Sequence, residues 1–244
     1  MKVDILAIGV HPDDVELGCS GVLINEIIAG KTAAIIDLTQ GELGSRGTID
    51  TRYSEAAEAA SIIGVVAREN LKFRDGFFVN DETHQLKLIQ FIRKYQPEVV
   101  FANVLDDRHP DHGRAGHLIA ESCFLAGLSK IETVDEQGNL QQKWRPKYVL
   151  HYIQDWYHEP DILIDVSDTF EQKMNSVKAY RTQFFSQQDD GEPTTYISTP
   201  DFLDSIVARA RMFGKRIGVK YAEGFISEKK IGIRSLDALV MVET

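Results

Sequence analysis

Asp4-Ile-Leu-Ala-Ile-Gly-Val-His-Pro-Asp-Asp-Val-Glu16 contains the strongest indications of the fold in this sequence. Its first half is an apolar run of the kind found in buried strands of parallel sheets. Its second half places a histidine and acidic residues directly after that run. In open α/β sheets, ligand sites form beyond the carboxyl ends of the strands. The stretch therefore predicts a first strand at residues 3–10 and a functional site where this strand ends.

A second stretch downstream repeats the pattern. The apolar run Val99-Val-Phe-Ala102 is followed by His109-Pro-Asp-His112. Two strands that both lead into acids and histidines indicate one shared site. The first turn argues against a dinucleotide site, because it is His-Pro-Asp-Asp rather than G-x-G-x-x-G and its carboxylates would repel a pyrophosphate. A nucleotide-dependent Rossmann enzyme stays as an alternative that a titration with NAD or a nucleotide sugar would test.

Strand-like and helical patterns alternate through the first half of the chain. We expect strands at 3–10, 33–39, 70–74 and 98–103, and helices at 19–29, 51–63, 81–95 and 112–128. This βαβα order predicts an α/β fold that is Rossmann-like, with a mostly parallel sheet and helices on both of its faces.

The second half of the chain has fewer patterns that indicate strands or helices. We expect strands at 147–153 and 161–166, then a helix capped by Asp168 with Glu171 completing a capping box. A last helix begins at Thr199-Pro200 and runs to Val219. The tail from Tyr221 onward has no clear period. Because neither a repeat nor a linker interrupts the pattern, we expect residues 1–244 to form a single domain.

Composition limits the classes of function. The chain has 244 residues, of which 43% are hydrophobic, and a formal net charge of -10. An acidic surface argues against nucleic acid or an anionic membrane as partner. The sequence has no apolar run long enough for a membrane span and no signal-peptide pattern. The two cysteines, Cys19 and Cys123, form no CxxC motif, so we expect a cytoplasmic protein.

The two acid–histidine clusters offer the ligand set of a hydrolytic zinc site. Asp13 and Asp14 are adjacent, so their side chains diverge, and one can bind the metal while the other stays free as a base. His109 precedes Pro110, which separates it in conformation from His112. One of these histidines can be a ligand while the other stabilises an oxyanion. Turn chemistry or helix capping explains either cluster alone, but not both at strand ends.

These residues resemble the PIG-L/LmbE-like family of zinc-dependent N-acetylglucosamine deacetylases. The family motifs (P/A)HPDD-x-E and HPDH-x-x-(A/G) stand here as Val10-His-Pro-Asp-Asp-Val-Glu16 and His109-Pro-Asp-His-Gly-Arg-Ala115. The segments 195–200 and 218–225 are similar to the subgroup that makes bacillithiol, which removes acetate from N-acetyl-glucosaminyl-malate.

The resemblance implies a role for each matching residue. Zinc, one ion per chain, would be bound by His11, Asp14 and His112, although Fe(II) or Co(II) would accept the same ligands. The catalytic residues would be Asp13 as general base, His109 as oxyanion stabiliser and possible acid, and Asp111, which would hold a histidine in place. Arg52 would bind a sugar hydroxyl or the malate carboxylate. We also expect Glu16 to bind substrate, the alternative being an acid that suits the helix dipole.

The expected activity is hydrolysis of the N-acetyl group of a glucosaminide, a small-molecule substrate, with N-acetyl-glucosaminyl-malate as the leading candidate. The alternatives are a mycothiol-type or chitooligosaccharide deacetylase, a thiol S-conjugate amidase, or a metal- or sugar-binding protein without turnover. The resemblance further implies a homo-oligomer, often a hexamer. The residues themselves leave open whether 186–199 forms a lid and whether Trp156, Tyr157 or His158 touches substrate.

Overall fold

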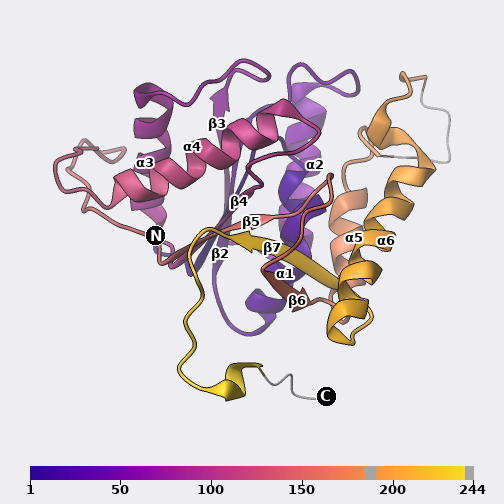
Figure 1. Cartoon of the computed structure of the whole chain (residues 1–244). Helices are drawn as coiled ribbons and strands as arrows, with labels where there is room; N and C mark the ends of the chain where they lie inside the picture. Colours follow the sequence, from indigo (N-terminus) through magenta and orange to yellow (C-terminus); the bar gives the residue numbers. More distant parts are fainter. Residues whose placement is uncertain (185–190, 240–244) are drawn as a thin grey trace.

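The computed structural model describes residues 1–184 and 191–239. Its centre is a seven-stranded sheet in the order β3-β2-β1-β4-β5-β7-β6 (Figure 1). Neighbouring strands from β3 to β5 are parallel, whereas β7 is antiparallel to both β5 and β6, so the predicted mostly parallel α/β fold is confirmed. The strands are β1 Ile5–Gly9, β2 Ala33–Thr39, β3 Ala67–Phe73, β4 Val99–Asn103, β5 Tyr148–Tyr152, β6 Ile162–Asp165 and β7 Ala222–Ser227.

Helices cover both faces of this sheet (Figure 1). The helices α3 and α4 pack together on one face, and α1, α2, α5 and α6 lie on the other. The helices are α1 Asp14–Ile28, α2 Ile49–Ile63, α3 Glu82–Tyr95, α4 Pro110–Ala126, α5 Phe170–Lys178 and α6 Pro200–Ile217, with 3-10 turns η1 Tyr196–Ser198 and η2 Leu236–Leu239. Among the described residues, none of these helices has both the length and the apolar character needed to cross a bilayer.

β1 is apolar on both of its faces, without the alternation of apolar and polar residues that is typical of a half-exposed strand. Leu6 and Ile8 pack into the core under α3 and α4, while Ile5 and Ala7 pack into the core under α1. Successive side chains of a strand point to opposite faces, and here both faces are covered. The end of β1 is thereby fixed at the centre of the sheet, where it delivers His11 to the carboxyl edge.

Several predicted boundaries differ from the structure. α1 begins at Asp14 rather than at residue 19, because the chain turns at Asp13, whose φ is 137°. β3 begins at residue 67, three residues earlier than expected. The predicted cap at Asp168 is wrong: Thr169 occupies the cap position of α5, and its hydroxyl contacts Asn25 and the carbonyl of Gly21 instead. Thr199 and Pro200 begin α6 as predicted, although the Thr199 hydroxyl donates to the carbonyl of Tyr196.

β7 is the element that the sequence did not indicate. Its residues include Glu223, which is buried, so the stretch lacks the apolar run of a central strand. The Glu223 carboxylate accepts hydrogen bonds from the backbone amides of Gly21 and Val22 in α1 and pairs with the ammonium of Lys173. Lys173 in turn donates to the carbonyl of Leu17. This buried ion pair joins β7 and α5 to the middle of α1, the helix that carries the first acid–histidine cluster.

We predict that Lys173→Met destabilises the fold by about 3–5 kcal/mol, because it leaves the Glu223 carboxylate buried without its cation. The measurement is urea unfolding followed by circular dichroism. The matched control is Arg181→Met, which removes an exposed pair with Glu58 and should leave the free energy of unfolding almost unchanged. Equal effects of the two variants would contradict the role assigned to the buried pair.

Candidate active site

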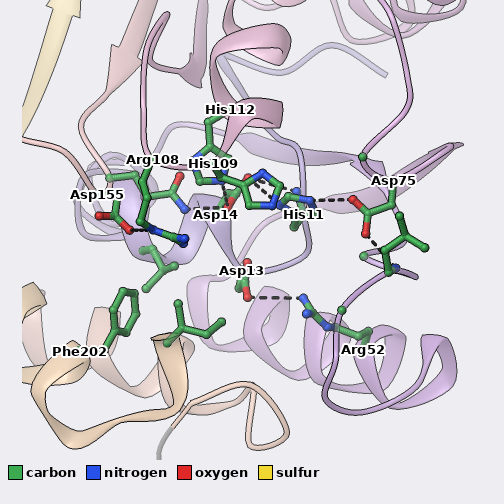
Figure 2. Close-up of a pocket in the computed structure, with 17 residues that line it drawn as sticks. His11, Asp13, Asp14, Arg52, Asp75, Arg108, His109, His112, Asp155 and Phe202 are labelled. Atoms are coloured by element: carbon green, nitrogen blue, oxygen red, sulfur yellow. Dashed lines mark hydrogen bonds and ion pairs between the residues drawn. The ribbon is translucent and has the colours of Figure 1, made fainter. Parts of the chain in front are cut away.

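A cavity of about 260 Å³ opens at the carboxyl edge of the sheet, where β1 and β4 end (Figure 2). It brings together side chains from both acid–histidine clusters and from α2. The predicted residues in its wall are His11, Asp13, Asp14, Arg52, His109 and His112, whereas Glu16 and Asp111 are not among its lining residues. The single site expected from the two strand ends is therefore present in the fold.

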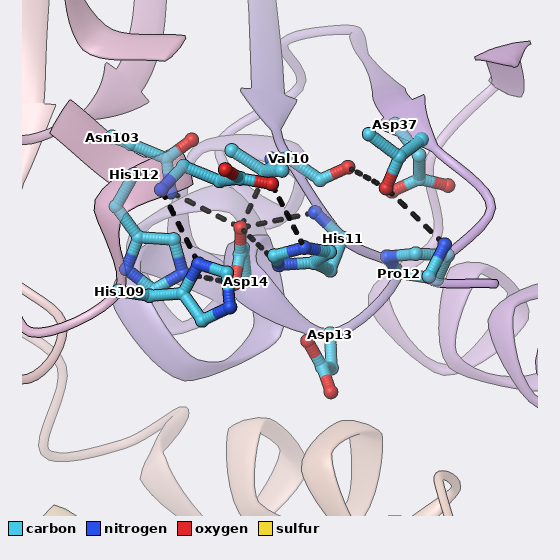
Figure 3. Close-up of polar contacts among 12 residues, drawn as sticks. Val10, His11, Pro12, Asp13, Asp14, Asp37, Asn103, His109 and His112 are labelled. Atoms are coloured by element: carbon cyan, nitrogen blue, oxygen red, sulfur yellow. Dashed lines mark hydrogen bonds and ion pairs between the residues drawn. The ribbon is translucent and has the colours of Figure 1, made fainter. Parts of the chain in front are cut away.

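Asp14 is the most heavily hydrogen-bonded residue of the site (Figure 3). One carboxylate oxygen accepts from the backbone amides of Val10 and His11, at 2.9 and 3.1 Å, and from the Asn103 amide. The other accepts from Gln154 at 2.7 Å and lies 3.3 Å from Nε2 of His112. Burial alone would raise the pKa of Asp14, but His112 and these donors hold it well below its usual value. Asp14 is therefore a permanent anion.

His11 and His112 each contact a carboxylate through one ring nitrogen. Nε2 of His11 lies 2.9 Å from Asp75, and Nδ1 of His112 lies 2.8 Å from Asp107. The opposite nitrogens, Nδ1 of His11 and Nε2 of His112, face Asp14 at 3.8 and 3.3 Å. A carboxylate that fixes one ring nitrogen and leaves the other free is the usual support of a metal-binding histidine.

His109 is placed differently. It caps α4, where its Nδ1 accepts from the backbone amide of Asp111 at 3.3 Å, so a neutral ring carries its proton on Nε2. Burial, together with the neighbouring His11 and His112, lowers the pKa of His109. This environment favours a neutral imidazole that can donate a hydrogen bond through Nε2.

Asp13 lines the cavity at the start of α1. It occupies the cap position of α1, yet its carboxylate makes no capping hydrogen bond in the described part of the chain. Its backbone φ of 137° is strained for a residue with a side chain. Burial raises the pKa of Asp13 to about 7, despite the Arg52 guanidinium 3.5 Å away. A carboxylate in this state can both accept and return a proton near neutral pH.

The donor atoms fit a metal ion. His11, His109 and His112 each offer a nitrogen, and these atoms lie within 4.8 Å of one another. Nitrogen and oxygen ligands about 2.0–2.2 Å from a tetrahedral zinc lie roughly 3.3–3.6 Å apart. The 3.3 Å separation between Asp14 and His112 matches this spacing, and the 3.8 Å separation between Asp14 and His11 is slightly longer. The structure therefore contains a candidate metal-binding group of three histidines, with Asp14 beside two of them.

Glu16 requires a correction. Its carboxylate is fully buried, accepts from Arg68 at 2.5 Å and from the Tyr180 hydroxyl at 3.2 Å, and lies outside the cavity. Arg68 also binds Asp37, so Glu16 belongs to a buried ionic cluster beneath the site. The prediction that Glu16 binds substrate is wrong, because neither its position nor its partners leave it accessible.

Asp111 also differs from expectation. Its carboxylate accepts from the amide of Gly76 and from Arg114, and it lies 3.9 Å from Nε2 of His11, beyond hydrogen-bonding distance. The histidines are held instead by Asp75 and Asp107, which the sequence reasoning missed. Both follow strand ends, β3 and β4 respectively, so the rule that located the histidines would also have located these two carboxylates.

The cavity is also lined by Arg108, Asp155 and Phe202, which Figure 2 labels, and by Ile197. Arg108 donates to Asp155 at 2.9 Å, and its guanidinium lies 4.1 Å from the ring centroid of Tyr196. In the segment 186–199, for which the sequence leaves a lid open, Ile197 lines the cavity, and residues 186–190 lie outside the described residues.

The other residues singled out in the sequence lie away from the reacting groups. Trp156 and Tyr157 are exposed and do not line the cavity, and His158 contacts the carbonyl of Asp106. Cys19 is buried in the core between the sheet and α1 and does not line the cavity either.

Comparison with known proteins places this site in a family. The model of the PIG-L family, described as GlcNAc-PI de-N-acetylase, matches residues 6–124, which hold both acid–histidine clusters. The conserved protein TT1542 from Thermus thermophilus has a crystal structure that is similar with a TM-score of 0.83 and 36% identity, over 95% of this chain and 97% of that one.

Two archaeal relatives have named activities. The diacetylchitobiose deacetylase of Thermococcus kodakarensis is 28% identical over 230 residues, which cover 90% of this chain and 81% of the relative. The N,N'-diacetylchitobiose deacetylase from Pyrococcus horikoshii, in complex with its inhibitor MPG, has a TM-score of 0.77 and 26% identity over 92% of this chain and 83% of that one. Both motifs, the geometry of the site and the similarity along nearly the whole chain agree, and the chain belongs to the PIG-L family of deacetylase enzymes.

Proposed function

We propose that this protein is a zinc-dependent deacetylase that removes the N-acetyl group of an N-acetylglucosamine derivative. The observation that carries the proposal is Asp13: a buried carboxylate on a strained backbone, which makes no capping hydrogen bond and lines the same cavity as the three histidines. A protein that only binds a metal or a sugar has no use for such a group, because binding requires no free base.

The residues divide the chemistry among them. Zinc would be held by His11, Asp14 and His112, and it would supply the Lewis acidity that activates water and polarises the acetyl carbonyl. Asp13 takes a proton from the attacking water, which its raised pKa permits, and returns it to the departing amine. The Nε2 proton of His109 points to a role in holding the oxygen that becomes negative as the carbonyl is attacked.

We propose N-acetyl-glucosaminyl-malate as the substrate. Two cationic side chains in the cavity wall, Arg52 and Arg108, suit a substrate that carries carboxylates. The segment 195–200, which resembles the bacillithiol subgroup, contributes Ile197 to the same wall. The runner-up is a chitooligosaccharide, since two relatives are diacetylchitobiose deacetylases.

The substrate proposal is tested by acetate release from a panel of compounds with the zinc-loaded protein. N-acetyl-glucosaminyl-malate should be turned over faster than N,N'-diacetylchitobiose or free N-acetylglucosamine. A preference for diacetylchitobiose would replace the malate conjugate by the runner-up. Turnover of none of the three would reject the substrate class while leaving the metal site untouched.

We predict that Asp13→Ala lowers the rate of acetate release by about 10²- to 10⁴-fold, the usual contribution of a general base. Zinc content, measured by mass spectrometry of the metal, should remain at the level of the unmodified protein, because Asp14 and the histidines are intact. Asp14→Ala is the comparison variant and should lose the metal itself. Unchanged activity of the Asp13 variant would remove the base from the mechanism.

Asp75→Asn and Asp107→Asn should each weaken zinc binding by about 10- to 100-fold, because they loosen the outer nitrogen of a ligand histidine. Competition with a chromophoric chelator measures this affinity. Asp81→Asn is a matched control, since Asp81 contacts Nδ1 of His84 at 2.6 Å on the exposed start of α3, outside the cavity. The control should bind zinc normally, and an equal loss there would show that the assay reports general stability.

A further inference from the structure

The chain that follows α5 returns to α1 and α2, two helices that contribute side chains to the active-site cavity. We call residues 180–184 the α5 turn. The Tyr180 hydroxyl donates to Glu16 in α1 at 3.2 Å, and Thr182 donates to Glu55 in α2 through its backbone amide and its hydroxyl, each at 2.8 Å. Glu16 and Glu55 are both buried. The α5 turn is therefore fixed to both helices by hydrogen bonds to buried carboxylates.

Gln183 is the buried amide of this turn, and 3% of its surface is exposed. Its Nε2 donates to the carbonyl of Arg46 and to the hydroxyl of Thr182, at 2.9 Å each, and its Oε1 accepts from the guanidinium of Arg52. Gln183 does not line the cavity, whereas Arg52 does. Because a buried amide with an unbonded end is costly, Gln183 fixes the positions of the groups that it contacts.

Arg52 extends this chain of hydrogen bonds to the turn between β1 and α1. One of its guanidinium nitrogens donates to Gln183. The other donates to the carbonyl of Pro12 at 3.1 Å and lies 3.5 Å from the carboxylate of Asp13 (Figure 2). One guanidinium therefore joins the backbone of this turn to the side chain that we propose as the base. The φ of Asp13 is 137°, and a strained conformation of this kind persists only where the surrounding structure holds it.

The glycine-rich loop after β2 lies against the same guanidinium. A Cβ atom on Gly41 would come within 3.3 Å of Arg52, and one on Gly44 within 3.1 Å, so side chains at these positions would push the loop and the guanidinium apart. Gly41 also has a φ of 64°, which glycine adopts without cost. The Arg52 guanidinium is therefore confined between this loop, the α5 turn and the turn that carries Asp13.

The acceptor that Gln183 offers to Arg52 is neutral. A carboxylate at this position would form an ion pair with Arg52 and would compensate its positive charge. The amide instead holds the guanidinium by a hydrogen bond and leaves the charge to act on Asp13 and on the cavity. Gln183 thus sets where this charge lies without cancelling it.

We propose that Gln183 is a positioning residue for the hydrolysis, which acts through Arg52 to hold the turn that places Asp13 in the cavity. This inference rests on the proposed function, in which Asp13 is the base. Gln183 itself does not touch the substrate. Its loss should slow the chemical step, because a base that is displaced from its productive position transfers a proton poorly.

The first test is the kinetics of Gln183→Met, which keeps the size of the side chain and removes both ends of the amide. At saturating substrate, kcat for acetate release should fall by about 10- to 100-fold, while the zinc content stays unchanged. The matched control is Gln172→Met, because Gln172 is exposed on α5 and donates to the carbonyl of Ile62. The control should keep its kcat. An unchanged kcat in Gln183→Met, or a rise in KM alone, would overturn the inference.

A double-mutant cycle tests whether Gln183 acts through Arg52. Arg52→Met should lower kcat by itself, and adding Gln183→Met to it should change kcat by less than about twofold. Equal losses in both backgrounds would show that Gln183 acts by another route, against the inference. Circular dichroism checks the fold of each variant. If Gln183→Met does not fold, Gln183→Asn takes its place, because the shorter side chain keeps a buried amide and withdraws its oxygen from Arg52.

A crystal structure of the Gln183 variant tests the inference without turnover. The Arg52 guanidinium should leave the carbonyl of Pro12, and an unmoved Arg52 would refute the proposed link. The kinetics of Asp13→Ala separate this inference from the proposed function. Full activity of Asp13→Ala rejects the base, and the inference with it. Loss of activity in Asp13→Ala beside full activity in Gln183→Met rejects the inference alone.

Discussion

The carboxylate of Asp14 makes the hydrogen bonds on which both the edge of the sheet and the geometry of the site depend. It binds the amides that close the turn after β1, the Asn103 side chain at the end of β4 and the Gln154 side chain just beyond β5. Three neighbouring strands of the sheet are thereby held in one arrangement at their carboxyl ends. The same anion faces both His11 and His112, so the bonds that fix the edge of the sheet also fix the spacing of the proposed metal ligands.

Asp13 and Asp14 show how backbone geometry separates two identical side chains. The turn at Asp13 directs its carboxylate into the cavity, where burial outweighs Arg52 and raises its pKa to about 7. Asp14, one residue on, points back into a cluster of donors that keeps it ionised. One residue can therefore exchange protons while its neighbour holds charge. The strained turn falls on the residue that we propose as the base, and strained backbone is common in active sites.

Much of the fold and of the site was predictable from the sequence, because functional residues of a parallel sheet gather where its strands end. The apolar runs at 5–9 and 99–103 located the central strands, and the rule that sites follow strand ends located both histidine clusters. Glu16 was misplaced because a sequence does not show that Arg68, fifty-two positions away, would bind it in the core. β7 was missed for a related reason. Charged residues are usually exposed, so Glu223 argued against a buried strand, and the sequence does not show that Lys173 pairs with it in the interior.

The position of β7 has a consequence for how the protein is made. This strand is inserted between β5 and β6, although it is the last strand along the chain. While the ribosome has yet to release the final residues, β5 remains an open edge and β6 has no neighbour in the sheet. An open edge of this kind invites pairing with other chains. The parallel part of the sheet can form earlier. The nascent protein therefore passes through a stage in which the parallel strands are paired while the edge at β5 is still unpaired.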